Sequence, residues 1–298
     1  MDNLVSMEEV EEFLRESAAS VNAELDHLIP ASGRGPRSLR DAMRWSLFAG
    51  GKRFRPALVS ATGLAFGGDR ALLVRCGAAV EMMHTYSLIH DDLPSMDDDD
   101  LRRGRETCHK KFGESTAILA GDALQALAFQ TIAADERLSS GIRTELIAGL
   151  GEAAACMVVG QQLDLEAEGK PVSADALEDI HKNKTGALIA FSVTAGALIA
   201  EASADDLAAV REYGEKIGLL FQIVDDLLDI TATTEQLGKT AGKDVAAAKA
   251  TYPSVIGLDP TYDRVRSASS ESVAALERMS RPAPMLHGLV AYMTARTS

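Results

Sequence analysis

Cysteines are scarce in this chain of 298 residues. The three that occur, Cys76, Cys108 and Cys156, are widely spaced and form no CxxC pair, so the sequence predicts neither a disulfide framework nor a cysteine-based zinc site. Residues 1–16 are acidic, whereas a signal peptide begins with a basic region followed by an apolar one. We therefore expect a cytoplasmic protein in a reducing compartment.

Aromatic residues and prolines are also sparse. Aromatic side chains make up 5% of the chain and there are 9 prolines, while alanine, leucine and glutamate are abundant, a composition that favours helix over strand. No proline- or serine-rich linker, low-complexity block or fixed-period repeat divides the sequence. We predict an all-α protein with a single domain at residues 1–298, and loops at residues 30–36, 67–69 and 231–243, where glycine or proline gathers.

The chain also lacks a net positive charge and long apolar runs. The formal net charge of −14 argues against a general nucleic-acid binder, because phosphate backbones require a basic face. The longest uncharged run, residues 185–200, is about one turn short of a membrane-spanning helix, so we expect a buried core helix and no stable membrane association. No Walker P-loop, GxGxxG or GxSxG motif supports a nucleotide-loop or serine-hydrolase function.

What the chain does contain is two clusters of aspartate. The first is DDLPSMD at residues 91–97 and the second is DDLLD at residues 225–229, and each follows an apolar stretch long enough to be a buried helix. Crowded carboxylates repel one another and are costly to bury, so they stay ionised only when fully solvated or beside a divalent cation. The apolar lead-ins favour a cation site, with a solvated acidic turn as the alternative for either cluster alone.

The spacing within each cluster indicates how an ion would be held. Asp225 and Asp229 are four residues apart and share one helical face, with Gln222 one turn earlier. Asp91 and Asp97 would lie about 120° apart on an unbroken helix, but the proline between them favours a break that turns both carboxylates inward. Magnesium suits such sites, because it takes oxygen ligands and is often completed by substrate phosphates.

Basic residues lie close to both clusters in the sequence. Lys52 and Arg55 are three apart in GGKRFRP and share one side if a helix begins there, and Arg102 and Arg103 follow the first cluster directly. The glycine-containing loop after the second cluster carries Lys239 and is suited to close over an anion. Together these groups indicate a ligand with phosphate and metal. Each group alone is more often a surface ion-pair patch.

A histidine lies on the helix that leads to the first cluster. His84 and Asp91 are seven residues apart, which leaves them roughly 20° apart around a helix axis and about 10 Å apart along it. A lone histidine at such a position is as often a hydrogen-bonded core residue as a ligand-binding one. His84 is therefore a candidate that the sequence leaves open.

Several longer strings occur in order along the chain. They are GGKRFRP at residues 50–56, HTYSLIHDDLPSMDDDDLRRG at 84–104, GQQLDLEAE at 160–168, NKTGAL at 183–188, FQIVDDLLD at 221–229, LGKTAGKD at 237–244 and KATYPS at 249–254. In these strings the sequence resembles the short-chain trans-isoprenyl diphosphate synthases and is close to the bacterial farnesyl diphosphate synthases. The resemblance implies an isoprenoid synthase bundle of long helices around a deep cavity, assembled as a homodimer.

Carried over position by position, the resemblance implies a site in which three magnesium ions hold the diphosphate of an allylic substrate. The implied metal ligands are Asp91, Asp97 and Asp225, supported by Asp92 and Asp229. The implied contacts of that diphosphate are Arg102, Lys184, Lys239 and Lys249, while Thr185 and Gln222 line the reacting end. Asp226 is a further implied catalytic residue. The implied pocket for isopentenyl diphosphate consists of Lys52, Arg55, His84 and Arg103.

The implied activity is a magnesium-dependent prenyltransferase that makes (E,E)-farnesyl diphosphate from isopentenyl and dimethylallyl or geranyl diphosphate. In the family, the position five before the first aspartate, here Tyr86, helps form the cavity floor, and an aromatic residue there resembles fifteen-carbon synthases. Ideal helix geometry instead places Ser87 on the face of Asp91. A geranylgeranyl diphosphate synthase is the alternative. A terpene cyclase and a non-catalytic regulatory subunit are weaker ones, because the DDxxD cluster and the full set of site residues argue against them.

Overall fold

The computed structural model describes residues 5–33, 35–231 and 249–296, and most of these residues are helical. The helices are α1 (Met7–Leu28), α2 (Arg37–Leu47), α3 (Phe54–Ala65), α4 (Arg70–Asp91), α5 (Cys108–Phe112), α6 (Glu114–Ala133), α7 (Ser140–Ala167), α8 (Ala174–His181), the π-helix η1 (Lys182–Gly186), α9 (Ala187–Ile199), α10 (Ala204–Thr231), α13 (Tyr252–Ile256), α14 (Leu258–Leu276) and α15 (Pro284–Ala295). A hairpin of β1 (Leu101–Arg102) and β2 (Arg105–Glu106) is the only sheet in the described ranges, so the all-α prediction is confirmed.

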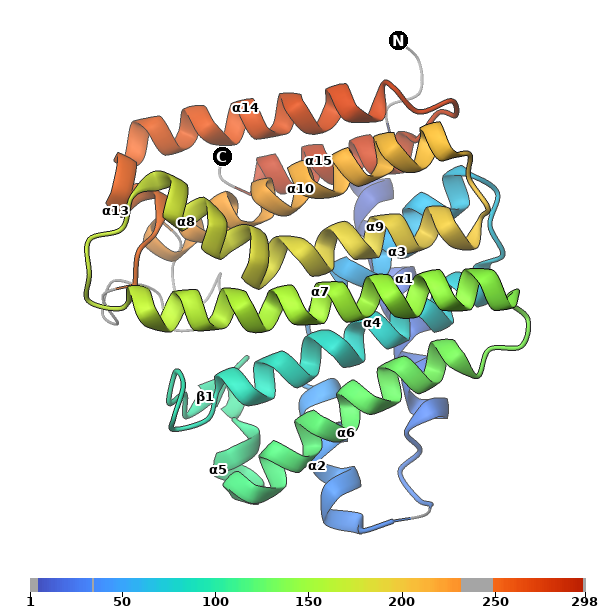
Figure 1. Ribbon diagram of the computed structural model, residues 1–298, viewed down its shortest axis with the longest axis vertical. Coiled ribbons are helices and arrows are strands. Elements are labelled where there is room, and N and C mark those ends of the chain that lie inside the picture. The colour runs from blue at the N-terminus through green and yellow to red at the C-terminus, as the bar shows by residue number, and fades with distance from the viewer. Residues whose placement is uncertain (1–4, 34, 232–248, 297–298) are drawn as a thin grey trace.

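Two long helices organise the core. α4 packs against α6, α3 and α1, whereas α10 packs against α14 and α9. α9 joins the two groups because it also contacts α3 and α7. Figure 1 shows α14, α10, α9, α7 and α4 crossing the molecule one above another, with the hairpin, α8 and α13 at the same end. Both aspartate clusters lie toward that end, at the last turns of α4 and α10.

Each long helix has its own apolar surroundings. α4 contributes Met82 and Met83, both fully buried, to a cluster shared with α6 and α7. α10 contributes Tyr213 and Ile217, also fully buried, to a cluster shared with α1, α3, α14 and α15. A fully buried side chain of this size stabilises the fold by about 1.5–3 kcal/mol. The two helices that carry the aspartates are therefore fixed by packing well before the clusters begin.

α4 has a defined start and a defined end. The Asp69 side chain accepts hydrogen bonds from Ala71 N and Leu72 N, which caps the first turn. The helix ends at Asp91, and the next residues form a turn in which Asp97 N donates to Asp91 O at 2.9 Å. The break predicted at the proline of the first cluster is confirmed, and it brings Asp97 back beside Asp91.

The π-helix η1 lies tightly between α7 and α10. A Cβ atom added to Gly160 of α7 would lie 2.1 Å from Lys184 N, and one added to Gly218 of α10 would lie 3.0 Å from Gly186 Cα. Only glycine permits backbones to approach this closely. π-turns inside helices occur frequently at functional sites, and this one carries Lys184 and Thr185.

The uncharged run at residues 185–200 falls in η1 and in α9, whose side chains are mostly buried, as expected for a core helix. Two other helices among the described residues, α6 and α7, are long and apolar enough to cross a membrane by length and composition. In their most apolar 18-residue stretches, 39% of the residues of α6 and 33% of those of α7 are buried. The predicted loops at residues 30–36 and 67–69 connect helices wherever the structure describes them. The loop predicted at 231–243 lies outside the described residues beyond Thr231, the end of α10.

Candidate active site

The first aspartate cluster lies at the end of α4. Burial raises the pKa of Asp91 to about 6, with Lys184 opposing the shift and the nearby Asp97 adding to it. The basic side chains near Asp91 therefore do not offset the cost of burying its negative charge. This is the condition in which a bound cation stabilises the ionised form.

Asp92, the second residue of the cluster, is buried and engages Arg102 of β1. Arg102 donates to both carboxylate oxygens of Asp92 over distances of 2.6–3.0 Å. Burial alone would lower the pKa of Arg102, but the contact with Asp92 outweighs it and raises that pKa. The forked pair fixes the hairpin to the end of α4 and holds Arg102 beside the cluster.

The second cluster lies on an unbroken stretch of α10, so Asp225 and Asp229 are one turn apart as the spacing predicts. Asp225 is partly exposed and lines a basic pocket, whereas Asp229 is 1% exposed. The first position of the cluster therefore faces a cavity. The last position is enclosed by the helices around it.

Asp226 is the centre of a buried hydrogen-bond network. One of its oxygens accepts from Tyr252 N at 2.9 Å and lies 3.1 Å from His181 Nε2, and the other accepts from Gln222 Nε2 at 3.0 Å. The rings of His181 and Tyr252 stack with their centroids 5.5 Å apart. These contacts join α8, α10 and α13. The amide of Gln222, which the resemblance places at the reacting end, is here bonded to Asp226.

Two lysines contact Asp164 of α7, and one of them also contacts the first cluster. Lys249 Nζ lies 3.0 Å from Asp97 Oδ1 and 3.6 Å from Asp164 Oδ2, and Lys184 Nζ lies 2.6 Å from the same Asp164 oxygen. Burial alone would raise the pKa of Asp164, but Lys184 and Lys249 outweigh it and lower that pKa. The structure thus brings both lysines to one wall of the site, with Thr185 next to Lys184 in η1.

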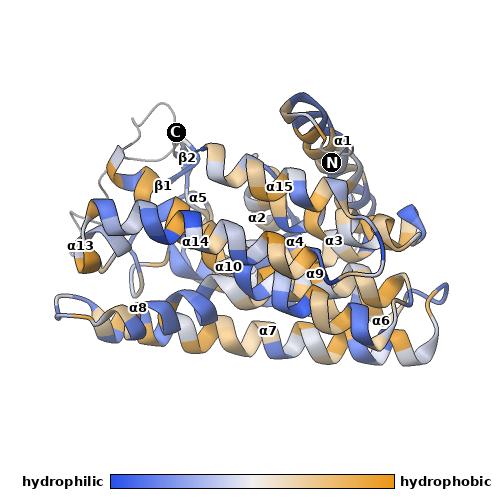
Figure 2. Ribbon diagram, turned by 90° about the horizontal axis from the view of Figure 1, so that it is seen from above, coloured by the Kyte–Doolittle hydropathy of each residue, from blue (hydrophilic) through white to orange (hydrophobic). Residues whose placement is uncertain are grey.

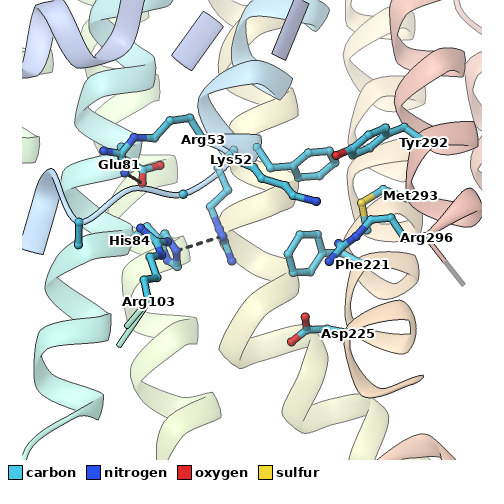
Figure 3. Close-up of a pocket in the computed structure, with 14 residues that line it drawn as sticks. Lys52, Arg53, Glu81, His84, Arg103, Phe221, Asp225, Tyr292, Met293 and Arg296 are labelled. Atoms are coloured by element: carbon cyan, nitrogen blue, oxygen red, sulfur yellow. Dashed lines mark hydrogen bonds and ion pairs between the residues drawn. The ribbon is translucent and has the colours of Figure 1, made fainter. Parts of the chain in front are cut away.

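A cavity of about 360 Å³ lies beside Asp225. It is lined by all four residues that the resemblance implies for the second diphosphate, Lys52, Arg55, His84 and Arg103, and also by Phe221, Tyr292 and Arg296. Figure 3 shows His84 and Arg103 on one side of this cavity and Tyr292 and Arg296 on the other, with Asp225 at its edge. The cavity therefore lies between α3, α4, α10 and α15.

The pocket presents an unused donor. Arg55 Nη1 donates to His84 Nε2 at 3.4 Å, and burial together with the charge of Arg55 lowers the pKa of His84, so the imidazole is neutral. Burial also lowers the pKa of Arg55 to about 10, and its Nε is buried with no hydrogen-bond partner among the described residues. A buried guanidinium with a spare donor is suited to bind an oxyanion.

The neighbouring basic residues reach different surroundings. α3 begins at Phe54, so Lys52 comes from the preceding loop and not from the helix, and its Nζ lies 5.3 Å from the ring centroid of Tyr292. Arg53 has a left-handed backbone with φ 49° and forms a buried ion pair with Glu81 at 2.7 Å. Its charge is thereby compensated by Glu81, and the cationic side chains left for a ligand in this string are Lys52 and Arg55.

Tyr86 lies one turn and a half before the end of α4. It is 6% exposed, its ring contacts His90 with centroids 5.5 Å apart, and burial followed by the charge of Asp91 raises its pKa. Ser87 is partly exposed and its hydroxyl donates to His84 O at 2.9 Å. Tyr86 is therefore the bulky residue below the first cluster, as the family pattern implies.

Lys239, predicted for the allylic diphosphate, lies outside the described residues. Sequence reasoning missed several residues that the fold brings to the site, namely Asp164, His181, Tyr252, Tyr292 and Arg296. Asp164 lies in the string GQQLDLEAE and could have been found there as a partner for a lysine. Tyr292 and Arg296 had no local signal, because only the packing of α15 brings them to the cavity.

Aspartate clusters at the ends of two core helices, with lysines and arginines around them, define a helical isoprenoid synthase. The family model for polyprenyl synthetase matches residues 36–279, and the chain belongs to this family of magnesium-dependent prenyltransferases. It is 45% identical over 288 residues to the farnesyl diphosphate synthase of Geobacillus stearothermophilus, covering 95% of both chains. It is 43% identical over 297 residues to geranylgeranyl pyrophosphate synthase 3, chloroplastic, of Arabidopsis thaliana, covering 95% of this chain and 81% of that protein.

Among solved structures, the chain resembles a geranyltransferase from Helicobacter pylori complexed with magnesium and isoprenyl diphosphate. The TM-score is 0.82 at 30% sequence identity, and the match covers 95% of this chain and 96% of that one. The fold prediction is thus confirmed by a relative of known structure.

Proposed function

We propose that the protein condenses isopentenyl diphosphate with dimethylallyl and then geranyl diphosphate to release (E,E)-farnesyl diphosphate. The observation that carries this proposal is the presence of two adjoining anion sites of different chemistry. One combines aspartates with Arg102, Lys184 and Lys249, which suits a diphosphate held through metal ions. The other is the cavity in which Arg55 Nε has no hydrogen-bond partner from the described part of the chain, and it suits a diphosphate bound directly by cations.

The residues of the first site fit magnesium. Asp91, Asp97 and Asp225 would supply carboxylate oxygens, the ligands that magnesium prefers, with Asp92 and Asp229 supporting them. The raised pKa of Asp91 supports a cation there, because a cation would restore the ionised form. We propose three ions, which when bound would neutralise charge that develops on the leaving diphosphate.

The side chains of the protein orient the two substrates. Lys184, Arg102 and Lys249 would hold the allylic diphosphate, together with Lys239. Arg55, Arg103 and Lys52 would hold isopentenyl diphosphate, and His84 as a neutral acceptor keeps the Arg55 guanidinium aligned. The allylic C–O bond then breaks and the double bond of isopentenyl diphosphate forms the new C–C bond. The proton lost from the adduct goes to the released diphosphate.

Water has to be kept from the allylic cation. The apolar cluster around α4, in which Tyr86 is buried, would shield the growing chain from water. We propose that Tyr86 forms the floor and limits the product to fifteen carbons.

We also propose a single-domain, cytoplasmic homodimer that does not insert in membranes. Figure 2 shows α6 and α7 on the same outer side of the molecule. Each carries two adjacent exposed apolar residues, which are Ile118, Leu119, Val158 and Val159, with exposed fractions of 43–58%. Such a patch is typical of an interface with another protein. The opposite faces of both helices pack into the core, which supports a subunit contact and not a membrane span.

The proposal is tested by mass spectrometry of the products formed from isopentenyl and dimethylallyl diphosphate with magnesium, and with a chelator as control. A fifteen-carbon diphosphate that disappears with the chelator is the expected result. A twenty-carbon product would keep the reaction and contradict the assignment of Tyr86. A cyclic hydrocarbon, or no prenyl product at all, would contradict the proposed reaction.

A further inference from the structure

A second group of potential metal ligands lies next to the first aspartate cluster and is not needed for the proposed reaction. It consists of Asp98 and Asp100, in the turn that leads into β1, and His109 on α5. One donor atom from each of the three lies within 4.8 Å of the others. The two aspartates are exposed, whereas His109 is only 6% exposed.

The hydrogen bonds of His109 define which of its nitrogens is available. The Thr107 hydroxyl donates its single hydrogen to Asp99 O at 2.7 Å, so its oxygen is left to accept from His109 Nδ1, which lies 3.1 Å away. His109 Nδ1 therefore carries the hydrogen of the neutral ring, and Nε2 carries the lone pair. That Nε2 is buried and has no hydrogen-bond partner among the residues that the structure describes.

The imidazole of His109 thus belongs to a group with two carboxylates, and its buried Nε2 lone pair meets no donor within the described ranges. A histidine whose other nitrogen is fixed by a hydrogen bond, as Nδ1 is here by Thr107, is the usual arrangement of a metal-binding histidine. Lys110 Nζ lies 2.7 Å from Asp100 Oδ1 and occupies that oxygen, which leaves Asp100 Oδ2 for a further contact. The Asp98 carboxylate completes the group.

We propose that Asp98, Asp100 and His109 bind one divalent transition-metal ion, with zinc as the best match, separately from the catalytic magnesium. Imidazole nitrogen suits zinc and similar ions, whereas magnesium prefers oxygen alone. Zinc bonds to nitrogen and oxygen of about 2.0–2.2 Å place donors roughly 3–4 Å apart, so the exposed aspartates have to close by about 1 Å. Water would fill the remaining positions.

The ion would tie α5 to the turn that contains Asp97. Within that turn Asp98 N donates to Leu93 O at 3.1 Å, and Asp99 lies 3.8 Å from Arg102. A bound cation would thereby brace the residues that hold the allylic diphosphate without touching the substrate. The inferred role is structural, so its main readout is metal binding and not turnover.

The test is calorimetric titration of the full-length protein with zinc chloride in the presence of excess magnesium and no diphosphate. We expect one zinc site, which Asp98→Asn and His109→Asn each weaken at least tenfold. Asparagine tolerates the positive φ of 47° at Asp98 and keeps its shape without the charge. At residue 109 the asparagine amide can retain the N–H contact to Thr107 while removing the lone pair of Nε2.

Two further variants locate the ion. Glu114→Gln, which removes an exposed charge at the start of α6, and Asp225→Asn, in the proposed magnesium site, should both keep zinc binding unchanged. Loss of zinc binding in Asp225→Asn with retention in Asp98→Asn would place the ion in the catalytic cluster and overturn the proposal. Absence of zinc binding in the unmodified protein would overturn it as well. If His109→Asn does not fold, Asp98→Asn decides, because that position is exposed.

Discussion

In both aspartate clusters, adjacent aspartates have different partners. Asp92 is held by Arg102 and Asp226 by His181, Gln222 and Tyr252 N, whereas Asp225 lines the open cavity. Successive residues on a helix point about 100° apart, so an adjacent pair places one carboxylate toward the site and the other into the packing. The second aspartate of each pair therefore anchors the helix end on which the first is displayed.

Replacing Asp91 with asparagine should separate activity from stability. Turnover should fall by roughly 10²–10³-fold, because a proposed metal ligand is lost. In a chelator the variant should melt at a higher temperature than the unmodified protein at pH 7.5, since burial disfavours the ionised carboxylate and raises its pKa to about 6. Turnover by product release and melting by circular dichroism check the two effects.

The stability difference has a defined pH dependence. A carboxyl whose pKa is raised on folding is penalised above that pKa, so the advantage of Asp91→Asn should shrink as pH falls through 6 toward 3.8. Asp122→Asn, at an exposed carboxylate of α6, is the matched control. A constant advantage at all pH values would contradict the explanation by burial.

Replacing Tyr86 with alanine should lengthen the product. Removal of the buried ring opens space between α4 and α6, so twenty-carbon diphosphate should appear beside or in place of the fifteen-carbon one. Tyr86→Phe keeps the ring and should keep the product. The products are separated by mass, and an unchanged length in Tyr86→Ala would place the floor at another residue.

Among the elements, η1 is the part of the site that depends most on its neighbours. It lies against Gly160 of α7 and Gly218 of α10, and it presents Lys184 to Asp164. The position of Lys184 is thus defined by the spacing of two helices that are distant in the sequence. A side chain on either glycine would move the lysine that is proposed to bind diphosphate.

Gly160→Ala should therefore lower both activity and stability. The new methyl group would clash with Lys184 backbone atoms, and overpacking of this kind costs about 1–3 kcal/mol. Gly151→Ala is the matched control on the same helix, because a Cβ there meets its nearest atom, Phe129 Cε1, at 3.9 Å. Denaturant unfolding and the KM for the allylic substrate are the measurements. Equal activity and stability of the two variants would contradict the proposed clash between residue 160 and the Lys184 backbone.

The sequence predicted what is local and periodic. The helical class, the break after Asp91 and the shared face of Asp225 and Asp229 follow from residue spacing and proline. The partners of Asp226 and the contribution of Arg296 do not, because they depend on which helices meet. The π-helix η1 could not be predicted from the sequence either, because the glycines that pack against it lie on α7 and α10 and not beside it in the chain.

For the whole molecule, the apolar patch on α6 and α7 defines the surface through which the proposed dimer would form. A paired substitution, Leu119→Asp with Val158→Asp, should dissociate it, because two buried charges without partners are unfavourable in an interface. Leu258→Asp, at a similarly exposed apolar residue on α14, should leave the assembly intact. Sedimentation velocity distinguishes the outcomes, and a monomeric unmodified protein would contradict the proposed interface.

The separation between Tyr86 and the charged groups has a consequence for how the family diversifies. Tyr86 lies on the apolar side of α4, whereas the carboxylates, lysines and arginines lie at its end and across the cavity. Under the role that we propose for Tyr86, a change at this single apolar position would alter the length of the product and leave the reaction unchanged. Proteins with names as different as farnesyl and geranylgeranyl diphosphate synthase can then remain nearly equally similar to this chain, at 45% and 43% identity.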